Sequence, residues 1–200
     1  MKLTFYGATG TVTGSKYLLE FGSKKILIDC GLYQGLKNLR LRNWEGVPFA
    51  ASDLSAVILT HAHMDHSGHL PRLVKEGYRG PIYCTRSTED LCRIMLPDAA
   101  MLMEEEAERA NRYGYSKHHP ALPFYTLEDA RAVFNQFESA HFGQEVSLGD
   151  GASVKFYRAA HILGAAFVAV RAEGKTVVFS GDVGRLYDPI LKPIEPLPQM

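Results

Sequence analysis

The amino-acid sequence predicts a mixed α/β fold of the α+β type. Short apolar runs typical of strands dominate residues 1–60, strands and helices alternate through the middle of the chain, and strand-like runs return in the last third. Two hundred residues with 46% hydrophobic side chains are enough for one domain with a sizeable core. Because no internal repeat or interdomain linker is visible, we expect a single domain.

Four strands are expected in the first third of the chain. The runs that predict them are "KLTFYG" (residues 2–7), "KYLLEF" (16–21), "KKILIDC" (24–30) and "AVILTHA" (56–62). Gly22 and Ser23 separate the second run from the third, and this pair is typical of a hairpin turn. The chain is therefore predicted to begin as a meander of β-strands.

Helices alternate with strands in the middle of the chain. Apolar residues at helical spacing predict a helix within residues 67–77, and "PIYCT" (81–85) predicts a buried strand. A long helix is expected over residues 88–112, capped by Thr88. We expect a kink or a break at Pro97, because proline removes a helical hydrogen bond.

One more helix precedes the strands of the last third. It is expected over residues 127–137, where Thr126 can act as the cap and Asp129 is an imperfect partner for a capping box. The runs that predict the later strands are "AHFGQEVSL" (140–148), "ASVKFYRAA" (152–160), "AAFVAVRA" (165–172) and "KTVVFSG" (175–181).

Composition and charge narrow the possible locations of the protein. Lys plus Arg and Asp plus Glu each total 22, so no net charge draws the chain toward nucleic acid or a membrane surface. We expect no secretion signal, because Gly7 interrupts the first residues before an apolar stretch can form, and no apolar run is long enough for a membrane span. Three cysteines without a CxxC pair suit reduced thiols. We therefore expect a cytoplasmic protein with no membrane partner.

The strongest functional signal is "THAHMDHSGHL" (residues 60–70), which holds four histidines and an aspartate. In an extended segment residues i and i+2 point the same way, so His61 and His63 can bind one ion. The turn that follows directs Asp65 and His66 toward a second ion. Burying these groups without a metal would leave several polar atoms unsatisfied. Imidazole and carboxylate ligands favour Zn²⁺ or a similar ion.

Two later stretches end strands with a further possible ligand. "YRAAHILGAA" offers His161, and "VVFSGDVG" offers Asp182 between small residues, where its carboxylate can bridge two ions. The number of candidate ligands favours two ions over one. The remaining histidines are interpreted as ordinary core residues: His69, His118, His119 and His141.

These motifs resemble those of the metallo-β-lactamase superfamily, whose H-x-H-x-D-H signature is met by His61, His63, Asp65 and His66. Within it, the chain resembles the β-CASP branch of RNA-processing nucleases. The closer likeness rests on "GATGTVTGSKYLL", on "LIDCGLYQG" with Asp29, on "AHILGAA" and "SGDVGR", and on "EEEAERANRYGYSKHHPALPFYTLEDA". The resemblance implies a metallo-β-lactamase αββα sandwich.

The resemblance also implies a role for each residue. It places His61, His63 and His161 on a first zinc, Asp65 and His66 on a second, and Asp182 between the two. Asp29 would orient these ligands, and Asp65 and Asp29 are the candidate catalytic residues. Two zinc ions about 3.5–4 Å apart lower the pKa of a shared water to about 7, which supplies hydroxide to attack phosphorus.

Family members continue beyond the "GDVGR" region with an inserted β-CASP domain and a segment that completes the sandwich. We therefore expect residues 1–200 to be the N-terminal part of the domain, incomplete at the C-terminus and without those segments. A final histidine ligand and a histidine thought to protonate the leaving group would be missing as well, so the second zinc is expected to be held weakly. Single-stranded RNA is the expected partner of the full-length protein, and a homodimer or a partner subunit is also expected.

The predicted function is RNA phosphodiester cleavage, as an endonuclease or a 5′-exonuclease, by a dinuclear-zinc hydrolase. Two alternatives stay open. The first is another hydrolase of the same fold, such as a glyoxalase-type thioesterase, a lactonase or a lactamase, because the histidine motif alone does not choose the bond that is cleaved. The second is a metal-binding fragment or scaffold without catalytic activity.

Overall fold

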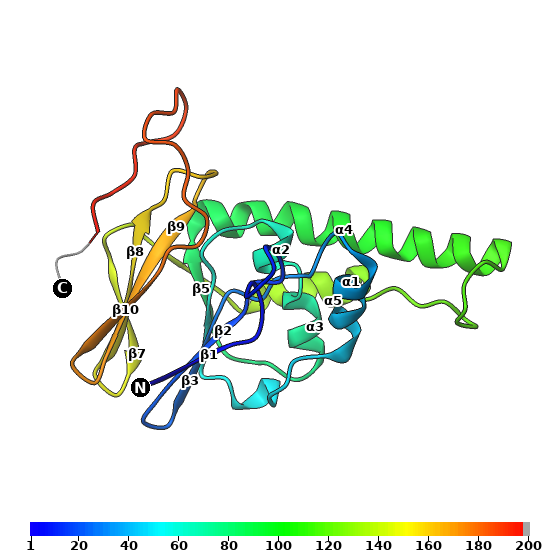
Figure 1. Cartoon of the computed structure of the whole chain (residues 1–200), viewed down its shortest axis with the longest axis horizontal. Helices are drawn as coiled ribbons and strands as arrows, with labels where there is room; N and C mark the ends of the chain where they lie inside the picture. Colours follow the sequence, from blue (N-terminus) through cyan, green and yellow to red (C-terminus); the bar gives the residue numbers. More distant parts are fainter. Residues whose placement is uncertain (198–200) are drawn as a thin grey trace.

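The computed structural model describes residues 1–197, which form three layers (Figure 1). A six-stranded sheet has the order β1-β2-β3-β4-β5-β6, and a four-stranded sheet has the order β10-β9-β8-β7. Helices pack on one face of the six-stranded sheet, and the four-stranded sheet packs on its other face. The predicted mixed fold is thereby confirmed, with helix, sheet and sheet as its layers.

The strands and helices have the following bounds. The first sheet contains β1 (Lys2–Phe5), β2 (Tyr17–Phe21), β3 (Lys24–Ile28), β4 (Ala56–Ile58), β5 (Ile82–Thr85) and β6 (Phe137–Ala140). The second contains β7 (Glu145–Gly149), β8 (Ala152–Arg158), β9 (Ala166–Ala172) and β10 (Lys175–Phe179). The α-helices are α1 (Lys37–Leu41), α2 (Met64–Ser67), α3 (Leu70–Lys75), α4 (Arg86–Tyr113) and α5 (Leu127–Ala132).

Strand direction places several chain segments at one edge of the first sheet. β1, β2 and β3 form the predicted antiparallel meander, whereas β3, β4, β5 and β6 run parallel. All strands of the second sheet are antiparallel. Because β3 and β4 are parallel neighbours, the loops that follow them leave the sheet at the same edge.

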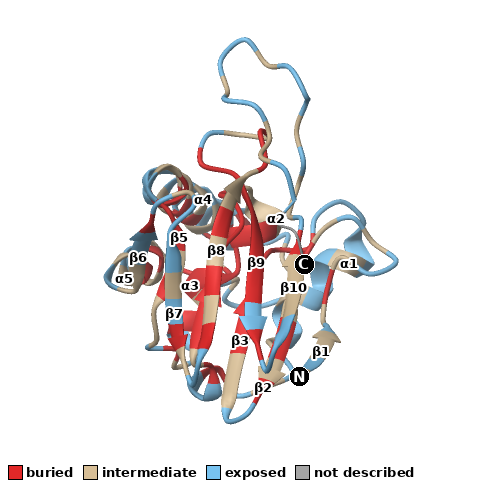
Figure 2. Cartoon of the chain, turned by 90° about the vertical axis from the view of Figure 1, so that its left-hand side faces the viewer, coloured by how far each residue is buried: buried red, intermediate tan, exposed pale blue. Residues whose placement is uncertain are grey.

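The two larger sets of apolar core side chains lie one on each face of the first sheet. Along β3, Ile26 and Ile28 face the second sheet while Leu27 faces the helices, as the two-residue period of a strand requires. Viewed from the second sheet, β9 is buried along most of its length (Figure 2). Within the described residues, no helix combines the length and the apolar character needed to cross a membrane.

The long helix differs from its prediction at two points. Thr85, not Thr88, is the cap, and its Oγ1 accepts a hydrogen bond from the Thr88 backbone N–H at 3.4 Å. Pro97 lies inside α4 without ending it. Proline removes only the bond to the carbonyl of Arg93, which is exposed to solvent, and the buried side chains on both sides of this turn hold the helix against the core.

The segment after Thr126 is helical over fewer residues than predicted. A complete capping box forms, because the Asp129 carboxylate accepts from the Thr126 N–H at 2.9 Å and the Asp129 N–H donates to Thr126 Oγ1 at 3.2 Å. The α-helix ends at Ala132, and β6 begins at Phe137, where a helix had been expected. Pairing with β5 decides this structure, and such a long-range pairing leaves no local pattern in the sequence.

Candidate metal centre

All seven predicted site residues lie together at the edge of the two sheets. Asp29 follows β3, and His61 and His63 follow β4. Asp65 and His66 belong to the short helix α2. The loop between β8 and β9 carries His161, and the segment after β10 carries Asp182.

Three histidines and one aspartate form a tight group of candidate ligand atoms. Single ligand atoms of His61, His63, His161 and Asp182 all lie within 4.8 Å of one another. His63 Nδ1 is 3.1 Å from His61 Nε2 and 3.2 Å from His161 Nε2. Nitrogen ligands at tetrahedral corners around zinc would be separated by about 3.3 Å, given Zn–N distances of about 2.0–2.1 Å. The donor set therefore fits a tetrahedral metal ion.

The Asp182 carboxylate faces two different sets of groups. Its Oδ2 lies 3.5 Å from His161 Nε2 and 3.9 Å from His61 Nε2. Its Oδ1 lies 3.4 Å from His66 Nε2, and that same nitrogen is 3.9 Å from Asp65 Oδ2. One oxygen thus belongs to the three-histidine group, and the other belongs to the group of Asp65 and His66.

Asp29 holds His66 from the buried side. Its Oδ2 is 2.7 Å from His66 Nδ1, and because an ionised carboxylate can only accept, the ring nitrogen donates. Thr60 donates to Asp29 through both its backbone N–H and its hydroxyl, at 2.8 Å each. Burial by itself lowers the pKa of His66, but the charge and the hydrogen bond of Asp29 raise it above its ordinary value. The Nε2 atom of His66 is therefore oriented toward Asp65 and Asp182.

Two histidines of the first group, His61 and His63, have lowered pKa values that favour the neutral imidazole. Burial, followed by the proximity of the other histidines, lowers the pKa of His61 to about 2. Burial also lowers the pKa of His63. A neutral imidazole keeps a free lone pair at physiological pH, which is the form that binds a metal ion.

Backbone hydrogen bonds from two glycine-containing stretches hold α2 in place. Ser15 N–H donates to the Asp65 carbonyl at 2.9 Å, and Cys30 N–H donates to the His66 carbonyl at 2.7 Å. A Cβ at Gly31 would lie 1.6 Å from the Asp65 carbonyl oxygen, so only glycine permits this approach. The stretches "GATGTVTGS" and "DCGL" therefore position the ligands of α2.

The loop that carries His161 is anchored to the start of α4. The hydroxyls of Thr85 and Thr88 both donate to the Gly164 carbonyl, at 2.7 Å and 3.1 Å. Gly164 has a φ of +82°, and a Cβ there would lie 2.5 Å from the Thr88 nitrogen. The contacts of these threonines with Gly164, and of Thr60 with Asp29, were not predicted from the sequence. Their one visible signal is that Thr60 directly precedes the histidine motif.

A hollow of about 550 Å³ opens beside the candidate ligands. Asp29, His66 and Asp182 line it on one side, and Phe5 and Val12 lie at its wall. The Asp182 side chain is 46% exposed. A solvent-borne molecule can therefore reach the carboxylate that lies between the two ligand groups.

The histidines outside the motif differ from their interpretation as core residues. His118, His119 and His141 are exposed, so for these three the interpretation is wrong. They lie in surface turns and connectors, where alternation of apolar residues gives no guidance. His69 is buried as predicted, but within residues 1–197 neither of its ring nitrogens has a hydrogen-bond partner.

Comparison with known proteins identifies the family. Residues 18–199 match the family described as "Metallo-beta-lactamase superfamily domain". The chain belongs to this superfamily. A solved metallo-β-lactamase with a HARLDQ motif from Cronobacter sakazakii has a similar fold, with a TM-score of 0.52 and 25% identity over 90% of this chain and 57% of that chain.

Curated relatives of this superfamily member include RNA-processing proteins. "Ribonuclease TTHA0252" of Thermus thermophilus is 39% identical over 202 residues, which cover 98% of this chain and 42% of the relative. "Transcription termination factor FttA" of Cenarchaeum symbiosum is 31% identical over 189 residues, which cover 92% of this chain and 27% of the relative. These relatives confirm the predicted resemblance to the β-CASP branch. The chain spans less than half the length of either one.

Proposed function

We propose that this chain is the metal-binding part of a dinuclear-zinc hydrolase that cleaves RNA phosphodiester bonds. The observation that carries the proposal is the Asp182 carboxylate, whose two oxygens face two separate ligand groups. A carboxylate in this position suits a bridge between two metal ions. The names of the relatives, a ribonuclease and a transcription termination factor, support RNA as the substrate class.

Each predicted residue has a place in this proposal. His61, His63 and His161 would hold one ion, Asp65 and His66 the other, and Asp182 both. When bound, two zinc ions lower the pKa of a shared water to about 7 and neutralise charge on the phosphate oxygens.

The protein supplies orientation around these ligands. Asp29 keeps the proton of His66 on Nδ1, so that Nε2 remains a lone-pair donor. The half-exposed face of Asp182 borders the hollow through which a phosphodiester would approach. Asp65, on the same helix as His66, completes the acidic side of that approach.

Metal analysis and activity of one ligand variant test the proposal. We expect about two zinc ions per chain, with the second lost more readily, and zinc-dependent cleavage of single-stranded RNA. His63→Ala should abolish the hydrolysis, because His63 Nδ1 lies between the other two histidines. His141→Ala, at an exposed histidine far along the chain, is the matched control. Full activity of the His63 variant would contradict the mechanism.

The same assay separates the alternatives. Hydrolysis of a thioester or a lactone in preference to RNA would indicate another hydrolase of this superfamily. Stoichiometric zinc without hydrolysis of any of these substrates would indicate a metal-binding scaffold.

We also propose that residues 1–200 are the N-terminal part of a longer protein that contains a β-CASP domain and a completing segment. The support is that the relatives are more than twice as long as the part they share with this chain. The intact mass of the native gene product tests this. A mass far above 22.2 kDa is expected, and a product of that mass would contradict it. A homodimer or a partner subunit stays a prediction.

A further inference from the structure

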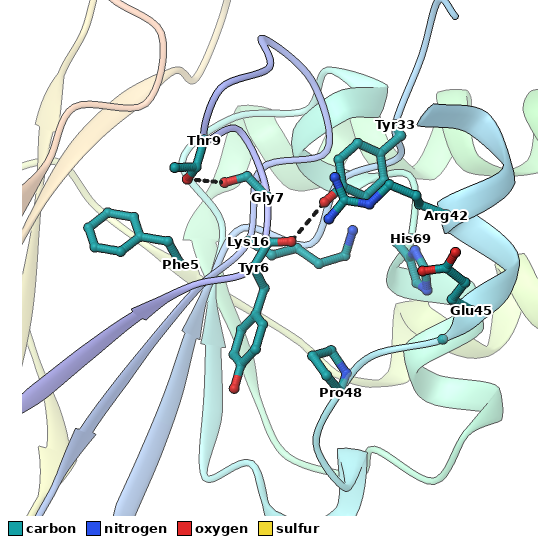
Figure 3. Close-up of a pocket in the computed structure, with 11 residues that line it drawn as sticks. Phe5, Tyr6, Gly7, Thr9, Lys16, Tyr33, Arg42, Glu45, Pro48 and His69 are labelled. Carbon is teal, nitrogen blue, oxygen red and sulfur yellow. Dashed lines mark hydrogen bonds between the residues drawn. The ribbon is translucent and has the colours of Figure 1, made fainter. Parts of the chain in front are cut away.

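A second pocket lies beside the metal centre but shares none of its candidate ligands. It has a volume of about 480 Å³. Figure 3 shows Lys16, Arg42 and His69 on one side of it, with Phe5 and Thr9 on the other. The segment between β1 and β2, the segment around α1 and the residue before α3 therefore form its walls.

Lys16 places a buried positive charge in this pocket. The residue is 4% exposed, and its Nζ donates to the carbonyl oxygen of Gly31. Among residues 1–197, no carboxylate forms an ion pair with Lys16. A buried ammonium group is costly unless it is paired, and burial accordingly lowers the pKa of Lys16.

Arg42 adds a second cation to the lining of this pocket. Its guanidinium carbon lies 4.4 Å from the centre of the Tyr33 ring, and Lys16 Nζ lies 5.2 Å from the same centre. Tyr33 is fixed by its hydroxyl, which donates to the Tyr6 carbonyl at 2.8 Å. The Tyr33 ring thus lies within contact distance of both positive charges.

His69 gives independent evidence that the pocket binds a ligand. It is 1% exposed, it lines the pocket, and both of its ring nitrogens lack a hydrogen-bond partner in the described chain. Its ring packs edge-on against Phe124, with the ring centres 5.2 Å apart, so its orientation is fixed. A buried imidazole always carries at least one N–H donor, and leaving it unpaired costs free energy.

We propose that this pocket binds the phosphate group of a small phosphate monoester through Lys16, Arg42 and His69. Two cations match the charge of a phosphate dianion, whereas a single carboxylate would balance only one of them. Phosphate also accepts hydrogen bonds from several directions, as three donors on different segments require. The acidic side chain at this pocket is Glu45, which is exposed.

The size of the pocket indicates whether phosphate is bound alone or as part of a larger molecule. A volume of about 480 Å³ falls in the usual range of small-molecule sites, and a free phosphate ion would fill only part of it. Inorganic phosphate and a nucleoside monophosphate share the group that the pocket recognises. The site is separate from the metal centre, so the proposal does not depend on the proposed hydrolysis.

Calorimetric titration of the chain with inorganic phosphate, and separately with AMP, tests the proposal. We expect saturable binding of one phosphate or one AMP per chain. We expect the same binding in His63→Ala, which removes a candidate metal ligand but no residue of the pocket. Lys16→Met should weaken this binding at least about tenfold, as the loss of a charged hydrogen bond predicts. Equal affinity for both probes would mean that the phosphate alone is bound, and tighter binding of AMP would mean that the attached group also contacts the pocket.

Two exposed residues keep the test decisive if Lys16→Met disturbs the fold. Arg42→Gln should weaken phosphate binding, and Glu45→Gln should strengthen it, because the first removes an attractive charge and the second a repulsive one. Both variants leave the buried Lys16 bond to Gly31 intact. Absence of saturable binding in the unaltered chain would overturn the proposal. Equal phosphate affinity in the unaltered chain, Arg42→Gln and Glu45→Gln would overturn it as well.

Discussion

The metal centre and the Lys16 pocket each contain a buried histidine from the same stretch of chain. His66 is 5% exposed and His69 is 1% exposed, and burial disfavours the charged form of both. Asp29 lies 2.7 Å from His66 and raises its pKa. Within residues 1–197 His69 has no such partner, and burial, together with the charges of Lys16 and Arg72, lowers its pKa to about 2. The partner of a buried histidine therefore decides the direction in which its pKa moves, even between neighbours three residues apart.

The two regions also differ in the balance of charge. Acidic side chains from three segments meet the histidines of the metal centre: Asp29, Asp65 and Asp182. In the pocket, two cations face only the exposed Glu45. This difference predicts cations as ligands of the first region and anions as ligands of the second.

Removing the partner of His66 should give the largest effect. Asp29→Asn keeps the shape of the side chain but removes the charge that orients His66, and we expect zinc affinity to fall by about 10–100-fold. Zinc competition with a chromophoric chelator measures this. Asp53→Asn is the matched control, because Asp53 is exposed and pairs only with Lys25 on the surface. An equal loss of zinc affinity in the two variants, or no loss in either, would contradict the role given to Asp29 as the partner of His66.

A smaller effect should come from the loop that carries His161. Gly164→Ala and Gly174→Ala both put a side chain on a left-handed residue, with φ of +82° and +68°, at a cost of about 1–2 kcal/mol each. At Gly164 the new Cβ would also meet the Thr88 nitrogen at 2.5 Å, whereas nothing lies within 4 Å at Gly174.

Urea unfolding and zinc titration of Gly164→Ala and Gly174→Ala separate the effect of backbone strain, which both variants have, from the effect of the close contact, which only Gly164→Ala has. We expect a larger loss of unfolding free energy for Gly164→Ala, and a loss of zinc affinity in that variant alone. Phosphate binding in the Lys16 pocket should be the same in both. Similar zinc affinity for the two variants would show that the Gly164 contact does not position His161.

Sequence reasoning located the candidate ligands because their spacing is local. His61 and His63 alternate along an extended segment, and His161 and Asp182 each end a strand, so each pattern could be seen without knowing the fold. Most strands were predicted for the same reason, but β6 was not. The residues that hold the ligands escaped prediction because their contacts join distant segments. Thr85, for example, donates to Gly164, which is 79 positions away.

The Lys16 pocket had no signal in the sequence. Lys16 lies in a stretch used to identify the family, and His69 was taken for an ordinary core histidine. Their side chains line one cavity because the fold brings distant segments together: the one between β1 and β2, the one around α1 and the residue before α3. The burial of His69 could be predicted from the sequence. The lack of hydrogen-bond partners for its ring nitrogens in the described residues could not, because such partners depend on tertiary contacts.

The predicted effect that is smallest near neutral pH concerns the pH dependence of stability. The unfolded chain protonates His69 near its ordinary pKa of 6.5, but the folded chain does so only near 2. Between these values the unfolded state binds one more proton at this site, so the free energy of unfolding falls as the pH falls. The contribution of this one group is up to about 1.4 kcal/mol per pH unit.

His69→Gln should remove this contribution, because glutamine does not titrate. Urea unfolding of the two proteins in phosphate-free buffer, compared at several pH values between His69's folded and unfolded pKa, measures the difference in slope. His61 and the other groups titrate in both proteins, so the difference isolates His69. His141→Gln, at an exposed histidine, is the matched control. Parallel curves for the His69 variant and the unaltered chain would mean that His69 is already paired with a proton acceptor, and that burial without a partner does not set its charge.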